Sequence, residues 1–151
     1  MTALPLDSIC QQIIEAPAEA ILVSDPAGSI TFWNAGAERI FGFTPEEALG
    51  QSLDLIIPQP MQKRHWDGYH RVMAGAASRY AAGDLLRVPA LRKDGQRISC
   101  QFSIVPLHDT DGQLAGMAAV LRDVTADWER EQALRARVRE LEKDLETPTK
   151  N

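Results

Sequence analysis

The chain has 151 residues, 44% of them hydrophobic and 25% charged, and this composition suits a single globular domain that buries a core. Its net charge of -5 argues against nucleic acid or an anionic membrane as the main partner, because both attract a basic surface. Neither a signal peptide nor an apolar run of about 20 residues is visible, so we expect a cytoplasmic protein.

The first predicted element is a short amphipathic helix. Residues 7–16, DSICQQIIEA, carry apolar side chains at positions 10, 13 and 14, and Pro17 is expected to end the helix. We therefore assign residues 1–17 to an N-terminal helical segment that lies outside the main sheet.

A domain with mixed strands and helices is predicted over residues 18–125. Turn signals such as Asp25-Pro26-Ala27-Gly28 separate runs of strand-forming residues, and Thr44 and Pro45 are typical of a helix start. The predicted strands are 18–25, 28–34, 83–95, 96–109 and 112–125, and the predicted helices are 35–43, 44–50 and 59–74. The order β-β-α-α-α-β-β-β indicates an α+β fold with a central antiparallel sheet.

The C-terminal segment differs in pattern from the domain. Leu134, Val138, Leu141 and Leu145 repeat with the 4, 3, 4 spacing of a coiled coil, and charges of alternating sign lie between them. We expect a coiled-coil helix over residues 126–147 that forms a homodimer, followed by a polar tail over 148–151. A solvated helix that packs back on the domain is the alternative.

Motifs of catalysis and of metal chelation are missing from the sequence. It has no glycine-rich phosphate loop and no Gly-x-Ser-x-Gly nucleophile motif, so we predict no enzyme and no catalytic residue. Cys10 and Cys100 are too few for a disulfide framework or a zinc site, and we expect each to be a small buried residue. His108 precedes a turn and is expected to be solvated.

The predicted helix over residues 59–74 holds two of the three histidines. On a helical wheel of about 100° per residue, His65 lies on the apolar face with Tyr69 and Val72, whereas His70 lies at the edge. An inward imidazole needs a hydrogen bond or a metal, because burying a polar nitrogen without a partner costs on the order of 1 to 3 kcal/mol. His65 is therefore the candidate site residue.

Several motifs together carry a family resemblance. The segment DPAGSITFWNAGAERIFGFTPEEALG, a long helix, the motif RKDG and the closing LRDVT follow one another in this order. This succession, over roughly residues 12–125, resembles a PAS domain, the sensory module of bacterial signalling proteins. The resemblance implies a five-stranded antiparallel sheet with short helices over one face, a ligand-sized cavity, and signalling to an effector protein whose identity is unknown.

The histidine helix resembles, in part, that of heme-binding PAS domains of the FixL and DosP type, which place their axial histidine there. This resemblance implies a heme b whose iron is bound by His65 and a diatomic gas as ligand. The residues implied to contact the cofactor are His65, Tyr69, Val72, Leu86, Ile104 and Met117.

Two departures from those heme domains bear on the site. They carry His-x-x-Tyr, whereas the spacing here is one residue longer, so counting back from Tyr69 gives Trp66 in place of His65. Their distal arginine, which hydrogen-bonds oxygen, is replaced by Leu86, and Arg87 should point to the opposite face of its strand. Without that donor, carbon monoxide or nitric oxide fits better than oxygen.

Two alternatives to heme stay open. The domain could bind a flavin or a small organic ligand, although the cysteine motif of the flavin light sensors is missing. It could also be a cofactor-free interaction module that acts by dimerisation, with His65 as a hydrogen-bonded core residue.

Overall fold

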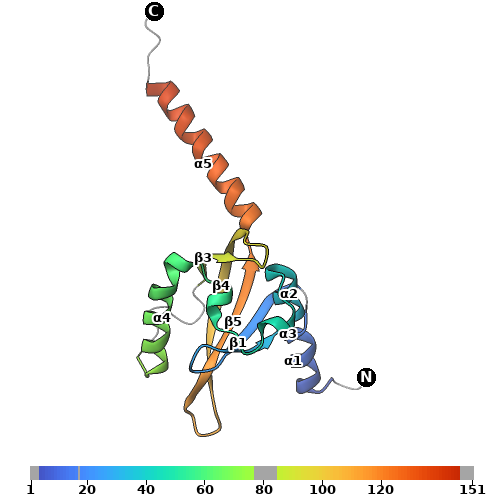
Figure 1. Cartoon of the computed structure of the whole chain (residues 1–151). Helices are drawn as coiled ribbons and strands as arrows, with labels where there is room; N and C mark the ends of the chain where they lie inside the picture. Colours follow the sequence, from blue (N-terminus) through green and yellow to red (C-terminus); the bar gives the residue numbers. More distant parts are fainter. Residues whose placement is uncertain (1–3, 17, 77–84, 147–151) are drawn as a thin grey trace, which may run out of the picture.

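The computed structural model describes residues 4–16, 18–76 and 85–146 and has a five-stranded antiparallel sheet at its centre (Figure 1). The strands lie in the order β2-β1-β5-β4-β3. Their bounds are Ala20–Ser24 for β1, Ile30–Trp33 for β2, Leu86–Leu91 for β3, Arg97–His108 for β4 and Leu114–Asp123 for β5. The predicted α+β fold is confirmed, whereas Pro17 and the predicted tail over 148–151 lie outside the described residues.

Five α-helices accompany the sheet within the described ranges. They are α1 Leu6–Ile14, α2 Ala35–Phe41, α3 Pro45–Ala48, α4 Gln59–Met73 and α5 Thr125–Glu146. The Asn34 Oδ1 atom accepts a hydrogen bond from the Ala37 amide at 2.8 Å, and Thr44 and Glu47 form a reciprocal capping box. A short 3-10 helix, η1 Leu53–Leu55, was not predicted from the sequence. Local capping chemistry thus explains where α2 and α3 begin.

The hydrophobic core lies between one face of the sheet, here called the inner face, and the helices α2, α3 and α4. The strand register places Leu22 of β1, Ala119 of β5 and Ile104 of β4 in one row of that face. Leu22 is buried, but Ala119 and Ile104 are only partly buried. In this row, the inner face is therefore less completely covered at β4 and β5 than at β1.

The C-terminal helix α5 extends away from the sheet (Figure 1), so the alternative in which it packs back on the domain does not hold. The side chains of Leu134, Val138, Leu141 and Leu145 are all exposed along it. Within the described ranges, no helix is both long enough and apolar enough to cross a membrane.

The two cysteines lie in different environments. Cys100 is fully buried on β4, and burial raises the pKa of its thiol to about 12. Cys10 is exposed, so the prediction that both cysteines are buried was wrong for Cys10. The physical reason is that α1, which carries Cys10, buries none of its residues in the core.

Candidate functional site

The candidate site is built on α4, which follows Pro58 and ends before Gly75, a glycine with a left-handed φ of 93°. Tyr69 is the buried residue of this helix, and His70 is exposed. The half-buried residues are Met61, Gln62, His65, Trp66, Gly68, Val72 and Met73. His65 and Trp66 therefore both face the domain. The spacing from His65 to Tyr69, one residue longer than in heme-binding PAS domains, does not place His65 in solvent.

Tyr69 ties α4 to the end of β1. Its hydroxyl donates a hydrogen bond to the backbone carbonyl of Asp25. The same hydroxyl forms a second hydrogen bond with the Ser24 hydroxyl, with 2.9 Å between the two oxygens. Ser24 is buried, so this contact also satisfies a polar group inside the core. The resemblance to heme domains implied that Tyr69 contacts a cofactor. In the structure, the Tyr69 hydroxyl joins α4 to the end of β1.

Trp66 provides a second anchor, which sequence reasoning missed. Its indole Nε1 donates to the Asp54 carboxylate in η1 at 2.7 Å. The ring covers Gly28, where a Cβ atom would lie 2.2 Å from it and where φ is 85°. Only glycine suits both the space and the backbone angle there. The turn signal that contains Gly28 was visible in the sequence, but its contact with Trp66 was not.

His65 lies between these anchors. Its ring centroid is 4.9 Å from that of Trp66 and 5.7 Å from that of Tyr69. The Nδ1 atom is buried and has no hydrogen-bond partner among the described residues. Burial lowers the pKa of His65, and the negative charge of Asp54 opposes that effect. Burial therefore favours the neutral imidazole, whose Nδ1 atom lacks a hydrogen-bond partner among the described residues.

The other residues that the heme resemblance implies lie on the inner face of the sheet or on α4, which covers it. Met117 is buried on β5 and pairs with Ser24, whereas Ile104 and Val72 are partly buried and pack against the core. Leu86 is half-buried and pairs with Phe102 of β4. Tyr69, Val72, Ile104 and Met117 thus belong to the same core region.

Gly68 is a half-buried residue of α4 with open space beside it. A Cβ atom built at Gly68 meets no atom within 4 Å. A hollow of about 570 Å³ lies between the end of α4 and the β4–β5 hairpin, and its walls include Val72, Met73, Pro106, His108 and Leu114. His108 is exposed, as predicted. Val72 lines this hollow, whereas His65 does not.

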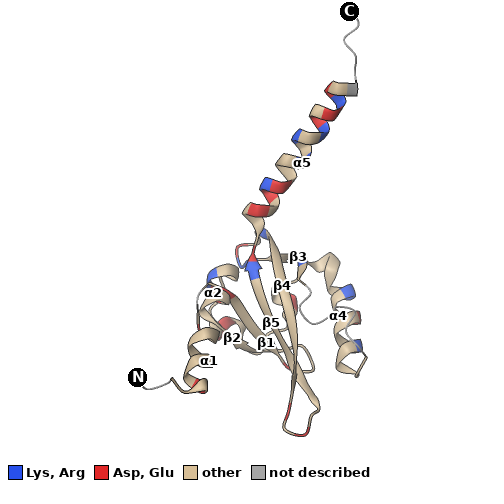
Figure 2. Ribbon diagram, turned by 180° about the vertical axis from the view of Figure 1, so that it is seen from behind, with Lys and Arg blue, Asp and Glu red and all other residues tan. Residues whose placement is uncertain are grey.

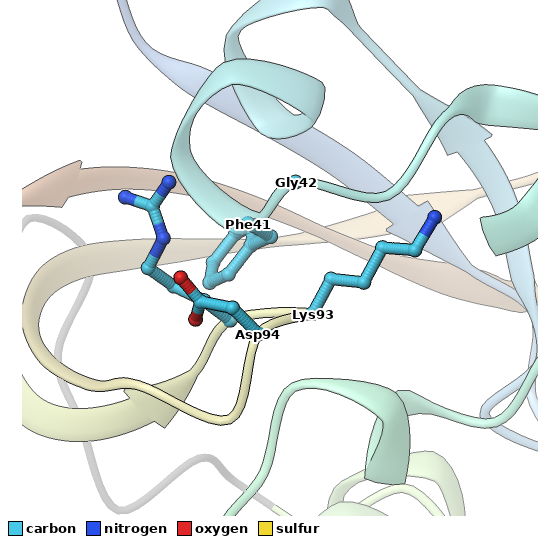
Figure 3. Close-up of a pocket in the computed structure, with 5 residues that line it drawn as sticks. Phe41, Gly42, Lys93 and Asp94 are labelled. Atoms are coloured by element: carbon cyan, nitrogen blue, oxygen red, sulfur yellow. The ribbon is translucent and has the colours of Figure 1, made fainter.

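A second hollow, of about 260 Å³, lies between the end of α2 and the β3–β4 turn. Figure 3 shows the Phe41 ring beside Gly42, with Lys93 and Asp94 extending from the turn. Lys93 forms an ion pair with Glu47 there. None of the residues implied to bind a cofactor lines this hollow.

His65 and the side chains around it fit a heme in their donor chemistry. A heme needs one or two axial protein ligands, and a neutral imidazole with a nitrogen that lacks a hydrogen-bond partner is a suitable one. The partly covered side chains of Ile104 and Ala119 offer an apolar surface on the inner face. Within the described residues, no group of three or more His, Cys, Asp or Glu side chains could hold another kind of metal ion.

A sequence profile of the PAS fold matches residues 15–127, three quarters of the chain. The chain belongs to the PAS fold family. The PAS domain of a protein from Colwellia psychrerythraea superimposes on it with a TM-score of 0.65 at 24% identity, over 78% of this chain and 98% of that one. That likeness supports the fold.

Two longer relatives match this PAS domain. The sensor protein FixL of Bradyrhizobium diazoefficiens is 27% identical over 89% of the chain, and a blue-light photoreceptor of Listeria monocytogenes is 26% identical over 98%. The chain spans 25% of the length of FixL and 57% of the length of the photoreceptor. The similarity to both therefore concerns one module of a longer protein.

Proposed function

We propose that this PAS domain is a sensory module that binds heme b between α4 and the inner face of the sheet, with His65 as the axial ligand. The observation that carries the proposal is the buried Nδ1 atom of His65, which lacks a hydrogen-bond partner among the described residues. Such a nitrogen costs about 1 to 3 kcal/mol in a folded core unless a hydrogen bond or a metal ion satisfies it. A bound heme would supply an iron centre for a diatomic gas.

The chain's own residues would determine which gas is bound. Leu86, Ile104 and Met117 offer apolar contacts and no hydrogen-bond donor. Hydrogen-bond donors in the distal pocket favour oxygen, so a site lined by these residues suits carbon monoxide or nitric oxide better. The similarity to the sensor protein FixL supports the sensory role.

A second candidate is a cofactor-free interaction module. The packing of His65 against Trp66 and Tyr69 favours it, because the two rings already fill part of the space around the imidazole. A flavin is the third possibility, and the similarity to a blue-light photoreceptor supports it. In each case the role is signalling rather than catalysis.

The signal would leave through α5. We propose that two copies of the chain pair along the seam of Leu134, Val138, Leu141 and Leu145, because this spacing buries one apolar stripe against another. The seam is exposed in the single chain. The effector that receives the signal, and the cytoplasmic location, stay predictions.

An absorption spectrum between about 300 and 700 nm, taken on protein produced with a heme precursor, tests the cofactor. A Soret band is expected in the original protein and is expected to be lost in His65→Ala. His70→Ala is the matched control, since His70 lies on the same helix and is exposed, and His108→Ala is a second control. Both controls should keep the band.

Three results would overturn the heme proposal. A colourless protein that takes up no added hemin would favour the cofactor-free module, and a yellow protein with a flavin spectrum would favour the third possibility. A Soret band that survives in His65→Ala would show that another residue holds the iron. Circular dichroism of each variant shows whether a lost band reflects a lost fold.

A further inference from the structure

The hollow of about 260 Å³ at the end of α2, here called the α2 hollow, carries charges of both signs. Its walls are Phe41, Gly42, Arg92, Lys93 and Asp94. Lys93 already forms an ion pair with Glu47, and in Figure 3 its side chain extends away from that of Asp94. Arg92 and Asp94 are therefore the charged groups of the hollow that are open to a ligand.

The Arg92 side chain has a buried donor without an acceptor. Arg92 follows directly after β3 and is half-buried. Its Nε atom is buried and has no hydrogen-bond partner among the described residues. A guanidinium keeps its charge at neutral pH, so the donor stays in place and needs an acceptor from outside the chain. A carboxylate fits it best, because the two planar groups can form two parallel hydrogen bonds.

Asp94 lies in the same turn as Arg92. The Gly95 amide donates to the Arg92 carbonyl at 2.9 Å, and the Arg92 amide donates to the Gln96 carbonyl at 2.9 Å. The Asp94 Oδ1 atom accepts from the Gln96 amide at 2.9 Å. Asp94 is exposed, and Figure 3 shows its carboxylate on the same side of the turn as the Phe41 ring. The turn therefore fixes the backbone of both charged residues at one edge of the hollow.

These two opposite charges share a hollow without pairing. Within the part of the chain that the structure describes, neither Arg92 nor Asp94 forms an ion pair. Along α5, by contrast, basic and acidic segments follow one another (Figure 2), and Arg137 pairs there with Glu140. The space between Arg92 and Asp94 therefore suits a ligand that brings a negative group to one and a positive group to the other.

A small amino acid has this chemistry. At neutral pH it carries a carboxylate and an ammonium group on one carbon atom. A phosphate or another multiply charged anion fits less well, since the Asp94 carboxylate would repel it, and Arg92 would repel a simple cation. The hollow is also smaller than the sites of about 300 to 1,000 Å³ that hold drug-sized ligands.

We propose that the α2 hollow binds a small amino acid, with the ligand carboxylate on Arg92 and the ligand ammonium on Asp94. This site goes beyond the proposed heme function, because none of the residues implied to bind a cofactor lines the hollow. The two proposals can therefore fail separately. Contacts open to water contribute little each, so the expected dissociation constant is on the order of 1 mM.

The first experiment titrates L-alanine into the isotope-labelled full chain and follows the backbone amide signals by NMR. The signals of Gly42, Asp94 and Gly95 should shift and saturate. Acetate and methylammonium each carry only one of the two charges, and each should bind about tenfold or more weakly at equal ionic strength. Acetate that binds as tightly as L-alanine would overturn the amino-acid site.

The second experiment repeats the titration with two variants. Arg92→Gln and Asp94→Asn should each weaken L-alanine binding about tenfold or more, because each removes one of the two charges. Since Arg92 is half-buried, Arg92→Gln also changes packing around its stem. Arg92→Lys keeps the charge and loses the planar two-bond geometry, so it should weaken binding severalfold. The amide spectrum without ligand shows whether each variant keeps the original fold.

The chain offers a matched control for each charge. Arg97→Gln removes a positive charge from an exposed residue at the start of β4 that does not line the hollow. Asp111→Asn changes the equivalent position of the β4–β5 turn, where the Gly112 amide donates to the Asp109 carbonyl at 3.0 Å. Both controls should bind L-alanine as the original protein does.

Two outcomes besides the acetate result would overturn the amino-acid site. One is the absence of saturable shifts in the original protein up to about 50 mM L-alanine. The other is unchanged affinity in both Arg92→Lys and Asp94→Asn. The heme spectrum of the same protein is read independently, so neither outcome bears on His65.

Discussion

Arg87 of β3 and Glu131 of α5 form an ion pair with 2.8 Å between Nη1 and Oε2. Glu131 also pairs with Arg135 one turn further along the helix, and the hydrogen bond from Arg87 is the main cause that lowers the pKa of Glu131. The neighbouring Leu86 points to the other face of the strand. The strand β3 therefore lies between the proposed ligand space on one face and its contact with α5 on the other.

Glu131→Gln should loosen the start of α5 while leaving global stability nearly unchanged, because exposed ion pairs contribute little to folding. We expect faster amide hydrogen exchange in the first two turns of α5, measured by mass spectrometry. Glu140→Gln is the matched control, since it breaks an ion pair with Arg137 inside the same helix. Equal exchange at the start of α5 in the two variants would show that the contact with β3 does not restrain the helix.

The strands and the short helices were predictable because their signals are local. The turn at Asp25–Gly28, the Asn34 cap and the capping box of Thr44 and Glu47 each depend on residues within a few positions of one another. The helical wheel likewise placed His65 inward and His70 at the edge of the apolar face, and the structure has His65 half-buried and His70 exposed.

The contacts that shape the candidate site were not predictable in this way. Trp66 meets Gly28 and Asp54, which lie far from it in the sequence, and no local pattern pairs them. Glu131 pairs with Arg87, which lies on a strand 44 residues away in the sequence. The exposure of Cys10 depends on the attachment of α1 through Asn34, which is also a long-range contact.

Tyr69→Phe should destabilise the domain by about 1 to 3 kcal/mol, because the Ser24 hydroxyl would lose its buried partner. Urea denaturation measures the change. Ser24→Ala alone should have a similar cost, and the double variant should cost less than the sum of the two single changes. Strict additivity of the two costs would mean that the two hydroxyls do not act as a pair.

The thiols should differ in reactivity at alkaline pH. Burial raises the pKa of Cys100 to about 12 from an ordinary value of 9.0, so this thiol stays protonated and unreactive at pH 8. A thiol reagent should therefore modify one cysteine, Cys10, in the folded chain and both cysteines in denaturant. Rapid modification of Cys100 in the folded chain would indicate that β4 opens readily.

Two glycine substitutions should act in opposite directions. A Cβ atom at Gly36 would lie 1.8 Å from the Glu19 carbonyl oxygen, so Gly36→Ala should destabilise the domain by about 3 kcal/mol. A Cβ atom at Gly68 meets nothing within 4 Å, and alanine favours a helix over glycine, so Gly68→Ala should stabilise the cofactor-free domain by about 0.5 to 1 kcal/mol.

The same Gly68 substitution probes the space beside α4. If heme occupies that space, the added methyl group should take room from it, and Gly68→Ala should hold heme less tightly than the original protein while folding more stably. Hemin titration followed at the Soret band, together with thermal unfolding of the cofactor-free form, measures both effects. Unchanged heme affinity in a stabilised variant would place the cofactor away from Gly68, and a loss of stability would show that the space is already filled by side chains.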